Sequence, residues 1–222
     1  MKRTPLHLRL LPRYTAAEER GNTVSHIVGF GFSVIAAVLC ILRSVPGGVL
    51  AVAAVSVYCA ALCLLYAMSS IYHGLHAGTG KKVMQIMDHC TIYILIAGTY
   101  TPIALIAIAP VSPAIGIGLT VFQWALAAFA IALTAIDLKK YNAFSMTCYV
   151  GMGWAILPFL KLVRQILGTG GFLFLLFGGI AYTIGAVLYG IGSKRKWFHF
   201  VFHIFVLLGS ALQFISIYYY VL

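Results

Sequence analysis

Two pairs of polar residues lie four positions apart in stretches that are otherwise almost entirely apolar. Ser69 and His73 form the first pair, and His199 and His203 form the second. Residues at positions i and i+4 point to the same side of a helix, so both members of a pair can reach one ligand. A histidine inside a membrane-spanning helix is costly unless it binds something. With the nearby carboxylate of Asp88, the three imidazoles predict a metal site.

The donor set favours zinc. We predict His73, His199 and His203 as metal ligands, because three neutral imidazoles suit Zn²⁺ and leave a fourth position open for water or substrate. Zinc would lower the pKa of water towards about 7. We assign catalytic roles to Asp88, which would accept a proton or orient a histidine, and to Ser69, which would stabilise an oxyanion. The alternatives are histidines that only pack within the bundle and an Asp88 that only complements a helix amino terminus.

The composition indicates a polytopic membrane protein. Of the 222 residues, 62% are hydrophobic and 9% are charged, and the mean hydropathy is +1.01. Soluble domains carry about 25% charged residues. We attribute the net charge of +11 to basic loops that face an anionic leaflet, and we expect no nucleic-acid partner. The five cysteines are odd in number and lie in or beside apolar stretches, which does not favour a disulfide framework.

Seven apolar segments are long enough to cross a bilayer, which requires about 20 residues each. The sequence therefore predicts an all-α fold, a seven-transmembrane helix bundle in the cell membrane. Residues 1–22 would form a basic cytoplasmic tail, and residues 23–222 a single transmembrane domain. Pro102 and Pro158 fall inside spans, where we expect kinks. The predicted spans are Val24–Leu42, Val49–Tyr72, Ile86–Ile108, Ala114–Ile136, Ala143–Leu160, Phe172–Ile191 and Phe198–Leu222.

Lysine and arginine are distributed unequally between the two sides of this topology. One side holds 12 of them and the other holds three, namely Arg43, Lys161 and Arg164. Because basic residues accumulate on the cytoplasmic side, the amino terminus is predicted to be cytoplasmic and the carboxyl terminus to lie outside. This orientation brings His73, Asp88 and His199 to a similar depth near the cytoplasmic face. The 12 residues are Lys2, Arg3, Arg9, Arg13, Arg20, Lys81, Lys82, Lys139, Lys140, Lys194, Arg195 and Lys196.

Other polar residues near the site have simpler explanations. Asn22 and His26 form a third i, i+4 pair, which could line the mouth of the site. We expect it instead to cap the first span or to form hydrogen bonds between helices. Glu18 and Glu19 are expected to be solvated in the tail, and Asp137 to lie on the surface. His89 neighbours Asp88 but points about 100° away on a helix.

Four stretches of the sequence resemble those of a known family. They are the segment 18–26 (EERGNTVSH), the segment 69–73 (SSIYH), the segment 88–102 (DHCTIYILIAGTYTP) and the segment 199–203 (HFVFH). Their order and spacing resemble the hemolysin III branch of the progestin and adipoQ receptor family, which belongs to a wider superfamily that includes alkaline ceramidases. The resemblance implies seven helices, a cytoplasmic amino terminus and zinc held by the three histidines, with Ser69 and Asp88 beside the metal. It also implies a role in bacterial membrane homeostasis.

Three functions are compatible with these residues. The first is a zinc-dependent hydrolase of lipid amides or esters, with a membrane lipid or fatty-acyl chain as substrate. The second is a non-enzymatic, zinc-stapled membrane sensor or receptor. A transporter or channel is the weakest candidate, because the polar residues cluster in one leaflet and leave no polar path through the other. The sequence does not indicate an oligomeric state.

Overall fold

The computed structural model describes residues 4–192 and 195–222, and every regular element in these ranges is a helix or a helical turn. Three members of the basic set counted above, Lys2, Arg3 and Lys194, lie outside the described residues. The helices are α1 (Ala16–Ser44), α2 (Gly48–Gly74), α3 (Thr79–Pro102), α4 (Pro113–Ile136), α5 (Asn142–Gly153), α6 (Leu160–Gly192) and α7 (Phe198–Ser216). Helix α3 continues as π-helical turns over Ile103–Ile108, and α7 continues likewise over Ile217–Val221.

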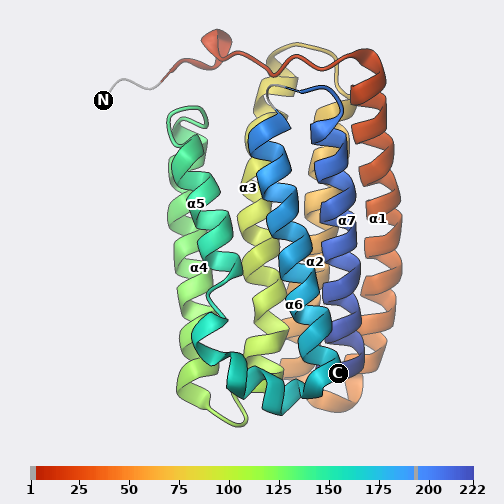
Figure 1. Cartoon of the computed structure of the whole chain (residues 1–222), viewed down its shortest axis with the longest axis vertical. Coiled ribbons are helices and arrows are strands. Elements are labelled where there is room, and N and C mark those ends of the chain that lie inside the picture. Colours follow the sequence, from red (N-terminus) through yellow and green to blue (C-terminus); the bar gives the residue numbers. More distant parts are fainter. Residues whose placement is uncertain (1–3, 193–194) are drawn as a thin grey trace.

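Five continuous helical segments in the described chain are long and apolar enough to cross a membrane. Two of them contain a pair of helices each, α1 with α2 and α5 with α6. Helices α1, α3, α5 and α7 start at one end of the bundle, and α2, α4 and α6 finish at that same end (Figure 1). Residues from the end of α2 and the starts of α3 and α7 therefore meet at one end of the bundle.

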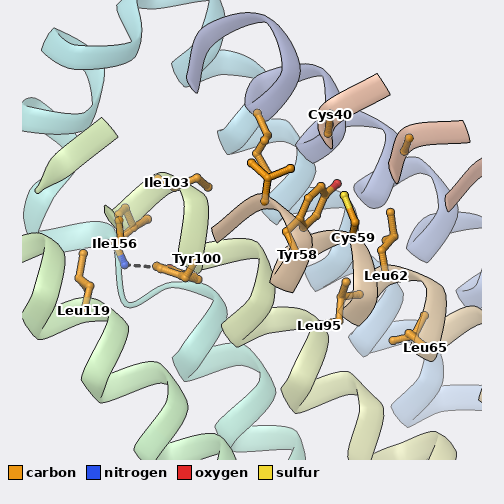
Figure 2. Packing of buried hydrophobic residues seen from close by; sticks show 14 of the residues in the cluster. Cys40, Tyr58, Cys59, Leu62, Leu65, Leu95, Tyr100, Ile103, Leu119 and Ile156 are labelled. Atoms are coloured by element: carbon orange, nitrogen blue, oxygen red, sulfur yellow. Dashed lines mark hydrogen bonds between the residues drawn. The ribbon is translucent and has the colours of Figure 1, made fainter. Parts of the chain in front are cut away.

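The predicted fifth span is interrupted. We expected one helix over Ala143–Leu160, but α5 ends at Gly153, a 3₁₀ turn follows over Leu157–Phe159, and α6 begins at Leu160. Pro158 lacks an N–H group and cannot continue the hydrogen-bond ladder of α5. The side chain of Tyr100 stabilises the break. Its hydroxyl donates to the carbonyl of Gly153 at 2.8 Å and accepts the N–H of Ile156 at 3.1 Å. Figure 2 shows the second of these hydrogen bonds.

Helix α6 is also divided. Gly168 adopts φ 65° and ψ 176°, a left-handed backbone conformation that glycine tolerates and other residues rarely adopt. The part of α6 before Gly168 lies across the end of the bundle, and the longer part after it runs back along α7 (Figure 1). The sequence predicted only the second part, as Phe172–Ile191.

The core lies between α2 and its neighbours, and a second apolar surface faces outward. Tyr58 and Leu62 of α2 are 1% and 0% exposed and pack with residues of α1 and α3 (Figure 2). By contrast, Val28 and Ile35 of α1 are 62% and 63% exposed. An apolar exterior of this kind requires contact with lipid rather than water.

The amino-terminal segment is docked on the bundle. The N–H of Thr4 donates to Asp137 at 3.1 Å, and Arg9 donates to the carbonyl of Ile136 at 2.6 Å. Hydrogen bonding from Thr4 lowers the pKa of Asp137 to about 2. Asp137 is only 4% exposed, so our expectation of a surface role was wrong. Helix α1 begins at Ala16, so the end of the predicted 1–22 tail is helical.

The close approach of α2 and α3 gives a test of the packing. A Cβ atom on Gly98 would lie 2.6 Å from the Cβ of Ala61, which is closer than any ordinary contact. We expect Gly98→Val to destabilise the protein by about 1–3 kcal/mol, as overpacked cores do. Thermal unfolding in detergent measures the effect. Gly118→Val on α4 is the control, because nothing lies within 4 Å of its added Cβ. Equal losses in both variants would contradict this packing.

Candidate metal centre

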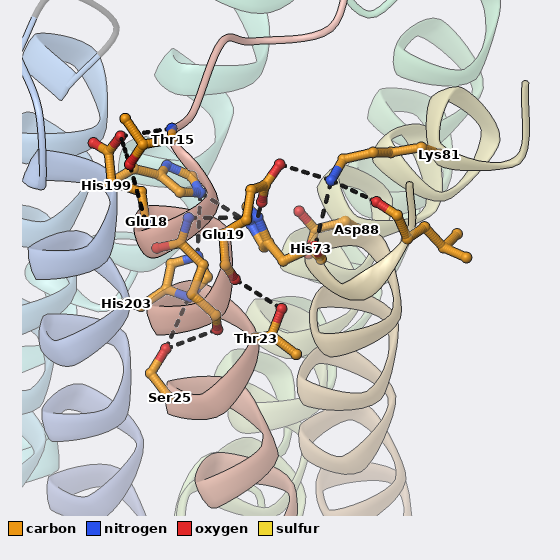
Figure 3. A network of polar contacts seen from close by, with 12 residues as sticks. Thr15, Glu18, Glu19, Thr23, Ser25, His73, Lys81, Asp88, His199 and His203 are labelled. Atoms are coloured by element: carbon orange, nitrogen blue, oxygen red, sulfur yellow. Dashed lines mark hydrogen bonds and ion pairs between the residues drawn. The ribbon is translucent and has the colours of Figure 1, made fainter. Parts of the chain in front are cut away.

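The structure brings the three histidines of the sequence prediction together at the end of the bundle where α2 finishes and α7 begins. The Nε2 atom of His199 lies 3.2 Å from Nε2 of His73 and 3.2 Å from Nε2 of His203. The three side chains point toward one another (Figure 3), and all three residues are buried. Three nitrogens bound tetrahedrally at 2.0–2.1 Å from zinc would lie about 3.3–3.4 Å apart. The observed spacing therefore fits one small cation.

The hydrogen bond between Glu19 and His73 fixes which nitrogen of His73 faces the cluster centre. Nδ1 of His73 lies 2.6 Å from Oε2 of Glu19. A carboxylate accepts hydrogen bonds, so Nδ1 carries a proton, and in the neutral ring Nε2 then keeps its lone pair. Lys81 donates to the other oxygen of Glu19 at 2.6 Å and holds the carboxylate in place. Our expectation that Glu19 is solvated was therefore wrong.

The contact between Ser25 and His203 likewise fixes which nitrogen of His203 faces the cluster centre. Its hydroxyl donates to the carbonyl of Asn22 at 2.9 Å, and its oxygen lies 3.2 Å from Nδ1 of His203. Because the hydroxyl proton is already used, the ring N–H of His203 is the donor in the second contact. Nε2 of His203 then also presents a lone pair to the centre. Metal-binding histidines commonly donate their outer nitrogen in this way.

Glu18 positions the start of α7, which carries two of the three histidines. Its carboxylate accepts the N–H of Trp197 at 2.7 Å, and its second oxygen accepts the N–H of Thr15 at 2.9 Å. Trp197 has φ 67°, which is rare for a bulky residue and requires support from its surroundings. Glu18 is 6% exposed, so it is not the solvated tail residue that we expected.

A helical pattern in the sequence could have identified this part of the site. Glu19, Asn22 and His26 are spaced i, i+3 and i+7, which places them on one face of α1. Nδ2 of Asn22 lies 3.4 Å from Nδ1 of His73. Both atoms carry hydrogen when Nδ1 donates to Glu19, so this contact between helices is not the hydrogen bond that we expected. We interpreted the glutamates separately from the Asn22–His26 pair and so missed the shared face.

Asp88 and Ser69 lie beside the histidines. Asp88 reaches the site from α3 (Figure 3). The hydroxyl of Ser69 on α2 forms a hydrogen bond with its carboxylate. Both line the same cavity as His199 and His203. The ring nitrogens of His89 contact the carbonyl of Gln85 at 2.8 Å and the hydroxyl of Tyr189 at 2.9 Å, and Nδ1 also lies 3.9 Å from the carboxylate of Asp88. As expected from its direction on the helix, His89 does not join the cluster.

His26 is buried beside the cluster without a hydrogen-bond partner. Its ring stacks on His203 with centroids 3.7 Å apart and an interplanar angle of 16°. Neither ring nitrogen has a partner in the described chain, although the residue is only 3% exposed. The expected cap or hydrogen bond between helices is therefore absent at His26. Because His26 lines the cavity, a bound molecule can satisfy it.

The cavity extends from the histidines into the interior of the bundle. Its volume is about 150 Å³, and it is lined by residues of α1, α2, α3, α5, α6 and α7. Asp88 and His199 lie at one end, and Tyr100, Trp154 and Gln213 lie along the rest. Most of its wall is apolar. The arrangement joins a polar centre to a narrow apolar chamber.

Tyr14 covers the cluster on the side of the amino-terminal segment. Its ring stacks on His199 with centroids 4.9 Å apart and an interplanar angle of 26°, and it also lies 5.8 Å from the ring of His73. Burial raises the pKa of the Tyr14 hydroxyl, so it stays neutral. The amino-terminal segment thus shields the centre from water at that end of the bundle.

Comparisons with known proteins agree with this arrangement. The family profile described as "Haemolysin-III related" matches residues 14–214. "Hemolysin-3" of Bacillus cereus is 36% identical over 92% of this chain and 92% of its own length. The "Hemolysin-3 homolog" of Bacillus subtilis (strain 168) is 33% identical over 93% of this chain and 96% of its own. No solved structure matches the chain.

A more distant human relative is also similar. The "Monocyte to macrophage differentiation factor" of Homo sapiens is 26% identical over 74% of this chain and 68% of its own length. The profile match includes the whole histidine cluster and the α1 residues that support it. With its long apolar helices, this chain is a multi-pass membrane protein that belongs to the haemolysin-III related family.

Proposed function

We propose that this protein binds zinc and hydrolyses amide or ester bonds of membrane lipids, in the service of membrane lipid homeostasis. The observation that carries the proposal is the convergence of three imidazole nitrogens beside an apolar cavity that His199 and His203 line. Asp88 and Ser69 line the same cavity. Metal binding by itself would not require a carboxylate, a hydroxyl and an apolar chamber in one place.

Zinc is the cation that best fits this donor set. The ligands would be Nε2 of His73, His199 and His203, all neutral nitrogens at a spacing suited to a small ion. Glu19 and Ser25 already hold the outer nitrogens of two of these rings. When bound, zinc supplies Lewis acidity towards a carbonyl group and makes water more acidic.

Asp88 and Ser69 would carry the proton transfer and the oxyanion contact. The Asp88 carboxylate would accept a proton from the attacking water and pass it to the leaving group. The Ser69 hydroxyl would donate a hydrogen bond to the carbonyl oxygen as negative charge develops on it. The apolar wall of the cavity would hold the acyl chain and exclude bulk water from the reacting bond.

We also propose seven membrane crossings, with the amino terminus in the cytoplasm and the carboxyl terminus outside. Among the described residues, the end of the bundle where α1 begins carries the basic residues of the α2–α3 and α4–α5 connections. The opposite end carries Arg43, Lys161 and Arg164. The excess of lysine and arginine at the first end supports this orientation. It puts the histidine cluster near the cytoplasmic leaflet.

A second function follows from the connection that the histidines make between helices. They join the end of α2 to the start of α7, so a bound ion would staple two helices that lie far apart in the sequence. A sensor or receptor could use such a staple without catalysis. That function needs the three histidines but does not need Asp88 to exchange protons.

Metal analysis gives the first prediction. We expect about one zinc per purified chain, and about a tenth of that or less in each of His73→Ala, His199→Ala and His203→Ala. Glu19→Gln should keep the ligands but weaken zinc binding about 10- to 100-fold in a chelator titration, because it removes the carboxylate that orients His73. His89→Ala is the control and should bind zinc normally. Full zinc content in the ligand variants would contradict the site.

Substitution of Asp88 separates the two functions. With fluorogenic acyl amide and ester substrates, we expect Asp88→Asn to lower kcat about 10²- to 10⁴-fold while zinc content is unchanged, because the variant cannot accept a proton. Asp137→Asn is the matched control, since this aspartate lies at the docked amino-terminal segment and should leave kcat unchanged. If wild-type protein with full zinc hydrolyses neither substrate class, the hydrolase proposal is wrong. The second function, a zinc-stapled sensor or receptor, is then the one that stands.

Labelling in intact cells tests the orientation. Lys139 and Arg164 are exposed at opposite ends of the bundle, so a cysteine at either position is accessible to a reagent. We expect Arg164→Cys to react with a membrane-impermeant maleimide and Lys139→Cys to react only after the cells are opened. The wild-type chain gives the background, because four of its five cysteines are buried. The reverse pattern of labelling would invert the proposed orientation.

A further inference from the structure

The cavity contains a second unmet hydrogen-bonding group far from the histidine cluster. Gln213 on α7 lines the cavity and is 6% exposed. Its Nε2 donates to the carbonyl of Leu175 on α6 at 3.1 Å. Its Oε1 has no partner in the described chain. A buried acceptor without a donor is costly, so a ligand donor that reached this oxygen would gain a hydrogen bond that the protein does not supply.

The orientation of the Gln213 amide is fixed by its surroundings. Rotating the amide by half a turn would point its oxygen at the Leu175 carbonyl, where two acceptors would repel each other. Gly178 makes the position possible, because a Cβ there would lie 2.8 Å from Nε2 of Gln213. The side chain is thus seated against α6, with Oε1 as its only free hydrogen-bonding atom.

The other polar groups in this half of the cavity are satisfied within the protein. The hydroxyl of Tyr182 pairs with Ser210, and the indole N–H of Trp154 donates to Thr183. The hydroxyl of Tyr100 bridges the α5–α6 break. Among the described residues that line the cavity, only His26 and Gln213 have buried side-chain atoms without partners. The cavity therefore has one unmet polar position beside the histidines and one deep among the apolar residues.

The distance between these positions limits the ligand. Gln213 follows His203 by 10 residues and His199 by 14, which corresponds to rises of about 15 and 21 Å along α7. The side chains lean in the same direction along the helix, so their offsets nearly cancel. An extended hydrocarbon chain covers this distance in roughly 12 to 16 carbon–carbon bonds.

We propose that the cavity selects acyl chains that carry a hydroxyl group about 12 to 16 carbons from the scissile carbonyl, and that Gln213 Oε1 accepts the hydrogen bond from that hydroxyl. The inference rests on the proposed function, since it assumes a carbonyl at the histidine cluster. A hydroxyl is the group required, because Oε1 is an acceptor and the surrounding wall is apolar. Gln213 is thus a specificity-determining residue.

Competition binding tests this selectivity. The probe is tritiated hexadecanoic acid, added to full-length, zinc-loaded protein in nanodiscs. The competitors are 12-hydroxydodecanoic acid and 16-hydroxyhexadecanoic acid, and each is compared with its unsubstituted parent acid. We expect at least one hydroxy acid to compete about 5- to 10-fold better than its parent, the gain from satisfying one buried acceptor. In Gln213→Met this ratio should fall to about one. Comparing ratios between proteins cancels differences in partitioning into lipid.

The chain offers a matched control. Gln123 is also a buried glutamine whose Nε2 donates to a carbonyl, that of Met152 at 2.8 Å, and whose Oε1 lacks a partner. It does not line the cavity, so Gln123→Met should keep the preference of the wild type. If Gln213→Met does not fold, 2-hydroxyhexadecanoic acid decides on the wild-type protein. Its hydroxyl lies at the wrong end of the chain and should bring no comparable gain.

The outcomes separate the inference from the function beneath it. If hexadecanoic acid binds but the hydroxy acids compete no better than their parents, water satisfies Gln213 and the inference is wrong, while the proposed function stands. A preference that survives in Gln213→Met also overturns it. If tritiated hexadecanoic acid does not bind at all, the acyl chamber of the proposed function fails together with the inference.

Discussion

The contact between Glu19 and His73 is the interaction on which the site depends. An imidazole can bind a cation only through a nitrogen that has kept its lone pair, and a neutral ring has one such nitrogen. Glu19 accepts the hydrogen bond from Nδ1 of His73, and Ser25 accepts that from Nδ1 of His203. Helix α1 contributes none of the three clustered histidines, yet it determines which atoms the other helices present to one another. Lys81 makes this arrangement possible, because an unpaired carboxylate beside apolar helices would be costly.

The same helix links the cluster to the rest of the fold. Residues of its first turns contact α2 through His73, α3 through Lys81 and the start of α7 through Trp197. The site therefore lies where α1 contacts α2, α3 and the start of α7. Deeper in the bundle the packing changes character. The Tyr100 hydroxyl forms hydrogen bonds with the backbone at the break between α5 and α6, and that break borders the apolar cavity.

The histidine cluster could be predicted from the sequence because its information is local. The i, i+4 spacing placed His199 and His203 on one face, and the count of basic residues placed His73 at the same depth. The role of Glu19 could have been inferred from the helix face that it shares with Asn22 and His26. The role of Glu18 depends instead on how α1 is rotated against the start of α7, which the spacing of the tail residues does not indicate. Charged residues at the start of a helix are usually solvated, and here the general rule failed.

The divided helices escaped prediction for a related reason. Hydropathy is continuous over Ala143–Leu160, so it gives one span. The break arises from Pro158 and from a tyrosine on α3 that satisfies the exposed backbone groups. Similarly, no sequence pattern distinguishes Gln213 from Gln123, and only the position of the cavity does.

The cluster is covered at one end of the bundle, and the cavity extends from it in the other direction. Tyr14 and the amino-terminal segment shield the histidines at the end of the bundle, where water would otherwise enter. The cavity instead runs towards α5 and α6, which touch each other far less than α6 touches α7. A charged, water-soluble substrate would have to displace Tyr14 to reach the centre. The lipid substrate of our proposal would instead come from the surrounding membrane and would not have to displace Tyr14.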